Sequence, residues 1–272
     1  MANDSCSLPD MQNSTSCINL PIQRVGITDL KMPIYISEKS GGFQHTVADV
    51  DVFVDLNAES KGTHMSRLAI GVQKFMDQPL NCNLLVDIAA YIRNKLDAET
   101  AEIIYKFPYF IKKNAPESKE PGLVYYNVVF DLTYSGGKKD IRDTKIVFKM
   151  SIETTATSLC PCSKEISDAS AHNQRSKIKI TSIPTNGRLV WLEDLAKISE
   201  ECASCEVYSS LKRVDEKHVT EKAYDNPKFV EDMVRELFQR LGKIDDLEWY
   251  KVEVTNEESI HQHSAYARME KE

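Results

Sequence analysis

Long hydrophobic segments are missing from this sequence. No stretch approaches the roughly 18 consecutive apolar residues that a membrane-spanning helix requires, so a protein anchored by such helices is excluded. The first residues, MANDSCSLPDMQNSTSC, are polar and lack the apolar centre of a secretory signal. We therefore expect a cytoplasmic protein without membrane contact, in which the seven cysteines remain reduced.

An excess of basic charge is also missing. The 34 lysines and arginines are outnumbered by 41 aspartates and glutamates, which gives a net charge of −7. Proteins that bind nucleic acids generally carry a basic balance, so we expect no nucleic-acid partner. An anionic small ligand remains compatible with this charge, because it needs only a local basic pocket.

The sequence does have the composition and patterning of a globular α+β protein. Its 272 residues are 42% hydrophobic and 28% charged, enough for a sizeable core in one large domain or two modules. In the first half, periodicity predicts a strand over 45–56, helices over 64–76 and 84–98, and strands over 102–112 and 122–134. In the second half it predicts strands over 143–155 and 176–182, helices over 191–203 and 227–241, a strand over 247–256 and a last short segment over 262–268. Thr63 and Asn226 are the expected N-caps of the first and last helices.

The order of elements is repeated, although the two halves share no clear sequence identity. We interpret this order as two modules, over 21–138 and 139–272, with antiparallel sheets and helices on one face. A turn at 135–140 separates the modules, and residues 1–20 are predicted to form a mobile arm. Small antiparallel sheets leave open edges, and oligomerisation is one way to cover them.

The segment 158–176, SLCPCSKEISDASAHNQRS, contains the residue types of a metal site. It holds Cys160, Cys162 and His172, and thiolate and imidazole are good zinc ligands. Because Pro161 disfavours helical backbone at the residue before it, we expect both cysteines on extended or turn backbone with their sulfurs on one side. The alternative is a pair of structural thiols and an unrelated surface histidine, since Cys-x-Cys is a weaker pattern than paired Cys-x2-Cys knuckles.

Two other groups of residues are relevant to a metal site. The C-terminal run EESIHQH holds Glu258, His261 and His263, and the first two would share a face in a helical turn but not in a strand. Alone, this run is typical of the polar end of a strand; together with the cysteine segment it offers enough ligands for a metal with an open position. Cys202 and Cys205 form a single Cys-x-x-C without a second pair, which favours a structural role over a metal or redox role.

Six motifs resemble those of the type IB GTP cyclohydrolases, prokaryotic enzymes of the tunnelling-fold superfamily. They are GTHMSR (62–67), SLCPCSKEIS (158–167), AHNQRS (171–176), LKRVDEKHVTE (211–221), FVEDMVRE (229–236) and ESIHQHSAYA (258–267). The resemblance runs from about residue 20 to the end of the chain. The sequence departs from the family pattern at Val214, where proline is expected, and at Gln262, where asparagine is expected, and neither position is assigned to chemistry.

The resemblance implies that the protein converts GTP to 7,8-dihydroneopterin triphosphate and releases formate, as the first step toward folate. It also implies a tunnelling fold with two ββααββ-type modules per subunit, and a homotetramer with active sites at subunit interfaces. A divalent metal is implied as well, either zinc or manganese, with iron as a further option. By matching motifs, its ligands are expected among Cys160, His172, Glu216, Glu258 and His261, with Cys162 close by.

The implied reaction requires an activated water and a proton donor. C8 of guanine is a poor electrophile, and a divalent ion lowers the pKa of bound water toward neutrality. As the imidazole ring opens, its nitrogen needs a proton, for which His172 or a thiol of Cys160 or Cys162 is the expected general acid.

The substrate itself requires contacts at both ends. Arg67, Lys164 and Arg175 lie in matching motifs and are candidates for binding the triphosphate, with His64 as a further candidate substrate contact. At the other end, guanine offers two adjacent donors, N1–H and the amino group, which one carboxylate can accept together. Glu231 matches the glutamate with which tunnelling-fold enzymes hold a purine or pterin.

Three other functions are compatible with parts of this pattern. Archaeal relatives stop at a 2′,3′-cyclic phosphate and prefer ferrous iron. A nitrile reductase of the same superfamily uses a cysteine nucleophile and NADPH, but the sequence has no nicotinamide-specific motif, and Glu258 and His261 argue against it. A metal-binding module without turnover would bind the ion tightly and release no formate from GTP.

Overall fold

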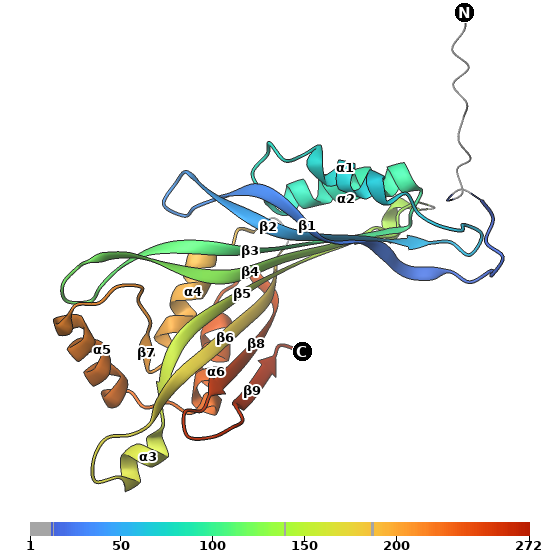
Figure 1. The fold of residues 1–272 in the computed structure, drawn as a ribbon. Helices are drawn as coiled ribbons and strands as arrows, with labels where there is room; N and C mark the ends of the chain where they lie inside the picture. Colours follow the sequence, from blue (N-terminus) through green and yellow to red (C-terminus); the bar gives the residue numbers. More distant parts are fainter. Residues whose placement is uncertain (1–11, 13, 139, 186–187) are drawn as a thin grey trace, which may run out of the picture. The chain divides into compact units, whose positions relative to one another are not determined.

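The computed structural model describes residues 12, 14–138, 140–185 and 188–272 (Figure 1). Its strands pair in the order β1-β2-β3-β4-β5-β6-β8-β9, with β7 beside β5. The pairs β5/β6, β6/β8 and β8/β9 are antiparallel. The fold is therefore of the α+β class that the element order predicts. No helix within the described ranges is long and apolar enough to cross a bilayer.

The elements follow a ββααββ order in the first half and an elaborated version of it in the second. The first half comprises β1 (Ile22–Ser37), β2 (Phe43–Leu56), α1 (Met65–Gln73), α2 (Cys82–Leu96), β3 (Thr100–Asn114) and β4 (Pro121–Ser135). The second comprises β5 (Lys145–Leu159), α3 (Pro161–Ile166), β6 (Asn173–Pro184), α4 (Leu192–Glu201), β7 (Cys205–Glu206), α5 (Arg213–Asp225), α6 (Val230–Leu241), β8 (Leu247–Glu257) and β9 (Ala265–Glu270). The elaborations are α3, β7 and α5.

Two compact units are interleaved along the chain, because the long strands contribute residues to both. The first unit comprises Met1–Ile36, of which the described part begins at residue 12, with Val47–Tyr105 and Asp131–Val147; the second comprises Ser37–Thr46, Lys106–Phe130 and Phe148–Glu272. A module boundary near residue 138 stays a prediction, and residue 139 of the predicted turn lies outside the described residues.

The predicted arm falls largely outside the described residues, which omit 1–11 and 13. The part that is described runs beside the segment before α1. Thr15 forms a β-bridge with Ser60, and the Ser16 N–H donates to the Glu59 carbonyl at 2.9 Å. The mobility of the arm stays a prediction.

In the first unit, α1 and α2 pack closely against each other. A Cβ atom at Gly71 would lie 2.8 Å from Cγ1 of Ile92, so only glycine permits this approach. The predicted cap of α1 is wrong by one residue: the N-cap is His64, whose backbone is extended and whose carbonyl accepts from the Arg67 N–H at 3.0 Å. Thr63 is buried instead and lies before the cap.

In the second unit, α6 packs on β8 and β9 (Figure 1). The apolar periodicity that predicts this helix corresponds to a buried face, on which Met233, Val234, Leu237 and Leu241 all lie. The predicted N-cap, Asn226, is wrong. Its amide donates to the carbonyls of residues 203 and 204, and its backbone ends α5, so α6 begins only at Val230.

The elements β1, α3, β7 and α5 were not predicted. The strand β1 has a visible alternation only near its end, where Met32, Ile34 and Ile36 are buried. The helix α5 lacks an apolar stripe, because only Asp215 and Ala223 are buried along it. The short α3 begins at Pro161, within the segment for which extended or turn backbone is expected.

Candidate functional site

The cysteine segment and the C-terminal polar run lie at one end of three neighbouring strands. In the register, Leu159 of β5 lies opposite Asn173 of β6, and Arg175 of β6 lies opposite Glu257 of β8. The residues just beyond these strand ends are Cys160, His172 and Glu258. The sheet therefore brings together a thiol, an imidazole and a carboxylate from segments that are far apart in the sequence.

Direct contacts connect these residues. The Cys160 N–H donates to the His172 carbonyl at 3.1 Å, and the His172 N–H donates to Ser163 Oγ at 3.2 Å. Nδ1 of His172 lies 3.8 Å from Oε2 of Glu258, and the two side chains are only 15% and 14% exposed. Thiolate, imidazole and carboxylate are the donor types that zinc accepts, and the last two also suit manganese, so this set fits a divalent metal.

The two cysteines occupy different backbone environments, which corrects the expectation that both are extended. Cys160 is extended, with φ −71° and ψ 118°, and its sulfur accepts the Ser163 N–H at 3.5 Å as the N-cap of α3. Cys162 lies inside α3 and is exposed. The reason is that a proline keeps the preceding residue out of the helix but is itself well suited to the first helical position.

The remaining predicted ligands, Glu216 and His261, are exposed. Glu216 lies in the first turn of α5. His261 closes a turn in which its N–H donates to the Glu258 carbonyl at 3.3 Å, and its ring stacks on that of His263 at 5.1 Å between centroids. Across the described ranges, no three histidine, cysteine, aspartate or glutamate side chains form a metal-binding group.

The predicted phosphate contacts of the second unit differ in how they are held. Lys164 of α3 donates to the Tyr224 carbonyl on α5, and its Nζ lies 4.2 Å from the centroid of the Tyr224 ring. These contacts with Tyr224 hold the ammonium group of Lys164 in place within the cysteine segment. Arg175 is exposed on β6.

Glu231 lies in the first turn of α6 and is exposed. Its neighbour Asp232 accepts the Phe229 N–H at 3.1 Å and so closes the start of the helix. Because Asp232 performs this capping role, Glu231 is not needed for it.

Arg67 and His64 belong to the first unit. His64 is the N-cap of α1, and Arg67 lies exposed in the first turn of that helix. Both are thus at the start of one helix, where backbone N–H groups favour anions.

Asp215 is a buried residue that the sequence reasoning missed, although it lies in the LKRVDEKHVTE motif. Its carboxylate accepts the N–H groups of Glu117, Ser118 and Lys212, each at 2.8 Å, and the Ser118 hydroxyl at 2.6 Å. Burial alone raises the pKa of the carboxyl, but these hydrogen bonds outweigh it and hold the pKa well below its usual value of 3.8. Asp215 therefore fastens the start of α5, which carries Glu216, to the turn between β3 and β4.

We predict that Asp215→Asn lowers the melting temperature at neutral pH by more than Ser118→Ala, because an amide places its NH2 group against donors. A carboxyl with a lowered pKa stabilises the fold above its unfolded pKa and loses this effect as the pH falls through the folded pKa. The difference in melting temperature between wild type and Asp215→Asn should consequently narrow on acidification from neutral pH to below 3.8. A difference that stays constant with pH would contradict this role of the ionised carboxylate.

Cys202 and Cys205 are buried free thiols. Burial raises the pKa of each to about 12, so both are protonated at neutral pH. This state is consistent with a structural role.

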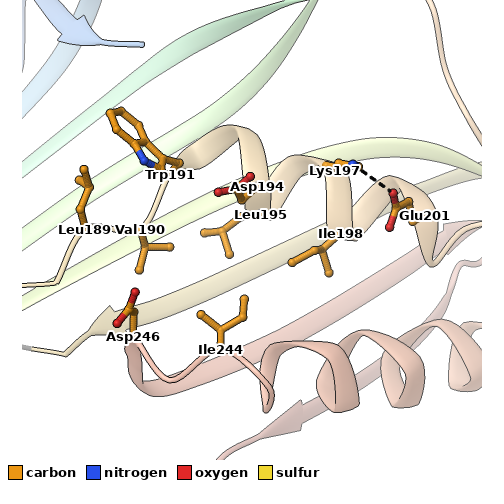
Figure 2. Close-up of a pocket in the computed structure, with 10 residues that line it drawn as sticks. All are labelled: Leu189, Val190, Trp191, Asp194, Leu195, Lys197, Ile198, Glu201, Ile244 and Asp246. Atoms are coloured by element: carbon orange, nitrogen blue, oxygen red, sulfur yellow. Dashed lines mark ion pairs between the residues drawn. The ribbon is translucent and has the colours of Figure 1, made fainter. Parts of the chain in front are cut away.

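A surface groove lies elsewhere in the second unit. It has a volume of about 400 Å³ and runs along α4, where Trp191, Ile198 and Ile244 line it (Figure 2). Its charged lining is already paired in part, since Lys197 Nζ lies 3.9 Å from a Glu201 carboxylate oxygen (Figure 2). The groove has no cysteine or histidine in its lining, so we do not assign the metal chemistry to it.

Known proteins match this chain over nearly its whole length. A family model described as "Type I GTP cyclohydrolase folE2" matches residues 8–267. A protein named GTP cyclohydrolase FolE2 from Nitrosococcus oceani is 44% identical over 265 residues, which cover 97% of this chain and 96% of the relative. One of the same name from Geobacter metallireducens is 42% identical over 266 residues, covering 98% of each chain.

Solved structures with the same fold include urate oxidases. A uricase from Bacillus fastidious has a TM-score of 0.59 at 8% identity and covers 92% of both chains. Urate oxidase from Bacillus sp. TB-90 has a TM-score of 0.56 at 10% identity and covers 92% of this chain and 99% of its own. At such low identity these likenesses bear on the fold alone, which is the tunnelling fold that the motifs imply.

Proposed function

This chain belongs to the type I GTP cyclohydrolase FolE2 family, and from that premise we propose that it hydrolyses GTP at C8 of guanine. The ring opens, formate leaves, and the remainder closes again to 7,8-dihydroneopterin triphosphate, the first step of tetrahydrofolate biosynthesis. The observation that carries this proposal is the family match over 8–267, which includes every motif residue considered above.

We propose that a divalent metal is held by Cys160, His172 and Glu258, with Glu216 and His261 as further ligands. The proximity of the first three at the ends of β5, β6 and β8 supports this set. When bound, a metal of this kind supplies an activated water at neutral pH. Zinc, manganese and iron all accept such a mixed donor set, so the ligands do not select among them.

The side chains of this protein then donate protons and bind the substrate. Cys162 is the proposed proton donor to the imidazole nitrogen that leaves C8, and His172 is the alternative donor in a site where it does not bind the metal. Glu231 accepts N1–H and the amino group of guanine and so fixes the base. Arg67, Lys164 and Arg175 are the proposed contacts of the triphosphate, for which cationic side chains are suited, and His64 is a further proposed substrate contact.

Reconstitution tests the metal requirement. The full chain is stripped of metal, supplied separately with zinc, manganese or ferrous iron, and incubated with GTP while pterin fluorescence is followed. At least one metal should restore turnover and excess chelator should abolish it. Full activity of the stripped chain, with metal absent by elemental analysis, would contradict the proposed site.

We further propose a homotetramer with active sites at subunit interfaces. Three exposed apolar residues lie on segments that carry proposed site residues: Ile166 on α3 at 83%, Val214 on α5 at 57%, and Ile260 after β8 at 63%. Exposed apolar surface is typical of protein interfaces, so we take these residues as candidate subunit contacts. The free state of the described cysteines fits the reducing cytoplasm that we propose as the location.

We predict that the dissociated monomer is inactive. Light scattering and GTP turnover are measured on the same samples across a dilution series. Turnover per subunit should fall together with the tetramer fraction. A monomer that retains full specific activity at the assay concentration would rule out an interfacial site.

A further inference from the structure

The ring of His172 contacts a buried amide. Its Nδ1 lies 2.8 Å from Oε1 of Gln174, two residues along the start of β6. Gln174 is only 8% exposed, and its side chain points to the same face of β6 as the buried Ser176. A buried amide loses its water partners, so each of its polar atoms needs a partner within the protein.

The second half of that amide is also held. Nε2 of Gln174 donates to Oγ of Ser158 at 2.9 Å, and Ser158 is fully buried on β5. With its NH2 group directed at the serine, the amide presents its oxygen to the imidazole. An amide oxygen can only accept, so the partner nitrogen Nδ1 must carry the proton.

A carboxylate faces the same nitrogen. Oε2 of Glu258 lies 3.8 Å from Nδ1 of His172, so two side-chain oxygens lie near this nitrogen. Negative charge near Nδ1 favours the tautomer in which that nitrogen is protonated.

We propose that Gln174 is a positioning residue that holds His172 in the Nδ1–H tautomer, with Ser158 fixing the orientation of the amide. The lone pair of Nε2 is then directed away from the sheet and available to a metal or a proton. That Nε2 binds a metal or a proton rests on the proposed function, whereas the Nδ1–H tautomer does not. Outer partners of this kind orient metal-binding histidines in general, and losing one costs 10- to 100-fold in metal affinity.

The tautomer is measured directly on the metal-free full chain. Histidine nitrogens are labelled with ¹⁵N, and spectra are recorded at a pH about two units above the ordinary histidine pKa of about 6.5. His172→Gln identifies the signal among the six histidines. Wild type should show a protonated Nδ1, and Gln174→Leu should show a mixture of tautomers. A protonated Nε2 in wild type would overturn the proposal.

The consequence for the metal is measured by competition with a chelating dye, using zinc and manganese. Gln174→Leu should weaken binding by about 10- to 100-fold. Gln174→Glu should restore most of it, because a carboxylate also accepts from Nδ1–H. If the amide were reversed and donated to Nδ1, the glutamate would oppose a lone pair and bind metal worse than the leucine variant.

Two serines provide matched controls. Ser158→Ala leaves Gln174 in place but frees its orientation, so an intermediate loss of affinity is expected. Ser176→Ala removes an equally buried hydroxyl on β6, the strand that carries Gln174. The Ser176 hydroxyl donates to Asn256 Oδ1 at 2.7 Å, and its loss should leave metal affinity unchanged. Equal losses in both alanine variants, or a Gln174→Leu affinity within about threefold of wild type, would overturn the positioning role. A chain with the expected tautomers but without metal binding or turnover would instead refute the proposed function alone.

Discussion

Replacing Glu231 with glutamine is expected to lower kcat/KM for GTP by at least about a hundredfold, or ~2.7 kcal/mol. The carboxylate is proposed to accept two adjacent donors of guanine, and such charge-assisted pairs are stronger than neutral ones. An amide keeps only one acceptor and turns a donor toward the base, which leaves a buried group unpaired at a cost of roughly 1–3 kcal/mol. Steady-state kinetics on folded, metal-replete protein measure the effect.

The neighbouring acid provides the control for Glu231. Asp232 lies on the same helical turn and accepts the Phe229 N–H, so Asp232→Asn changes an equally negative side chain without touching the proposed base contact. This variant should retain activity within a few-fold of wild type. If Glu231→Gln loses less than about tenfold, ~1.4 kcal/mol, Glu231 is only a charge at a helix start, worth ~0.3–1 kcal/mol.

Replacing Cys160 with serine should abolish turnover and lower metal affinity by more than the 10- to 100-fold that is typical of changes outside the ligand shell. Serine is a good N-cap, so it can accept the Ser163 N–H in place of the sulfur and preserve the start of α3. The hydroxyl remains protonated at neutral pH and does not replace a thiolate as a ligand. This substitution separates metal binding from local folding.

Cys82 provides the control for Cys160. Cys82 is the first residue of α2 in the first unit and is not among the proposed site residues. Burial raises the pKa of its thiol. Cys82→Ala therefore removes a thiol without changing the proposed site. Metal content and rate should both be unchanged in it. Near-normal metal content and turnover in folded Cys160→Ser protein would remove Cys160 from the site.

The strands and the amphipathic helices could be predicted from the sequence because one face of each is buried. In β2, Val50, Val52 and Val54 occupy alternate positions and are almost fully buried, and the apolar residues of α6 recur at helical spacing and are buried on one face. The helix α5 could not be found by periodicity, since its first turn is held by hydrogen bonds to one buried carboxylate, Asp215, and not by apolar packing.

The candidate site was predictable only as a set of residue types. Spacing identified Cys160 and His172 as donors, but the placement of Glu258 beside His172 depends on the pairing of β6 with β8, which no local pattern specifies. For the same reason, the sequence did not identify Gln174 as a partner of His172. The contact of Gln174 with Ser158 depends on the pairing of β5 with β6, which is not visible in the sequence around His172.

The most direct test of the central claim follows the carbon that is removed. GTP labelled with ¹³C at C8 is incubated with the metal-loaded full chain, and the products are separated by charge and identified by mass. One labelled formate should appear for each GTP consumed, together with an unlabelled 7,8-dihydroneopterin that retains three phosphates. Label that stays in the nucleotide, or a product that carries a 2′,3′-cyclic phosphate, would contradict the account.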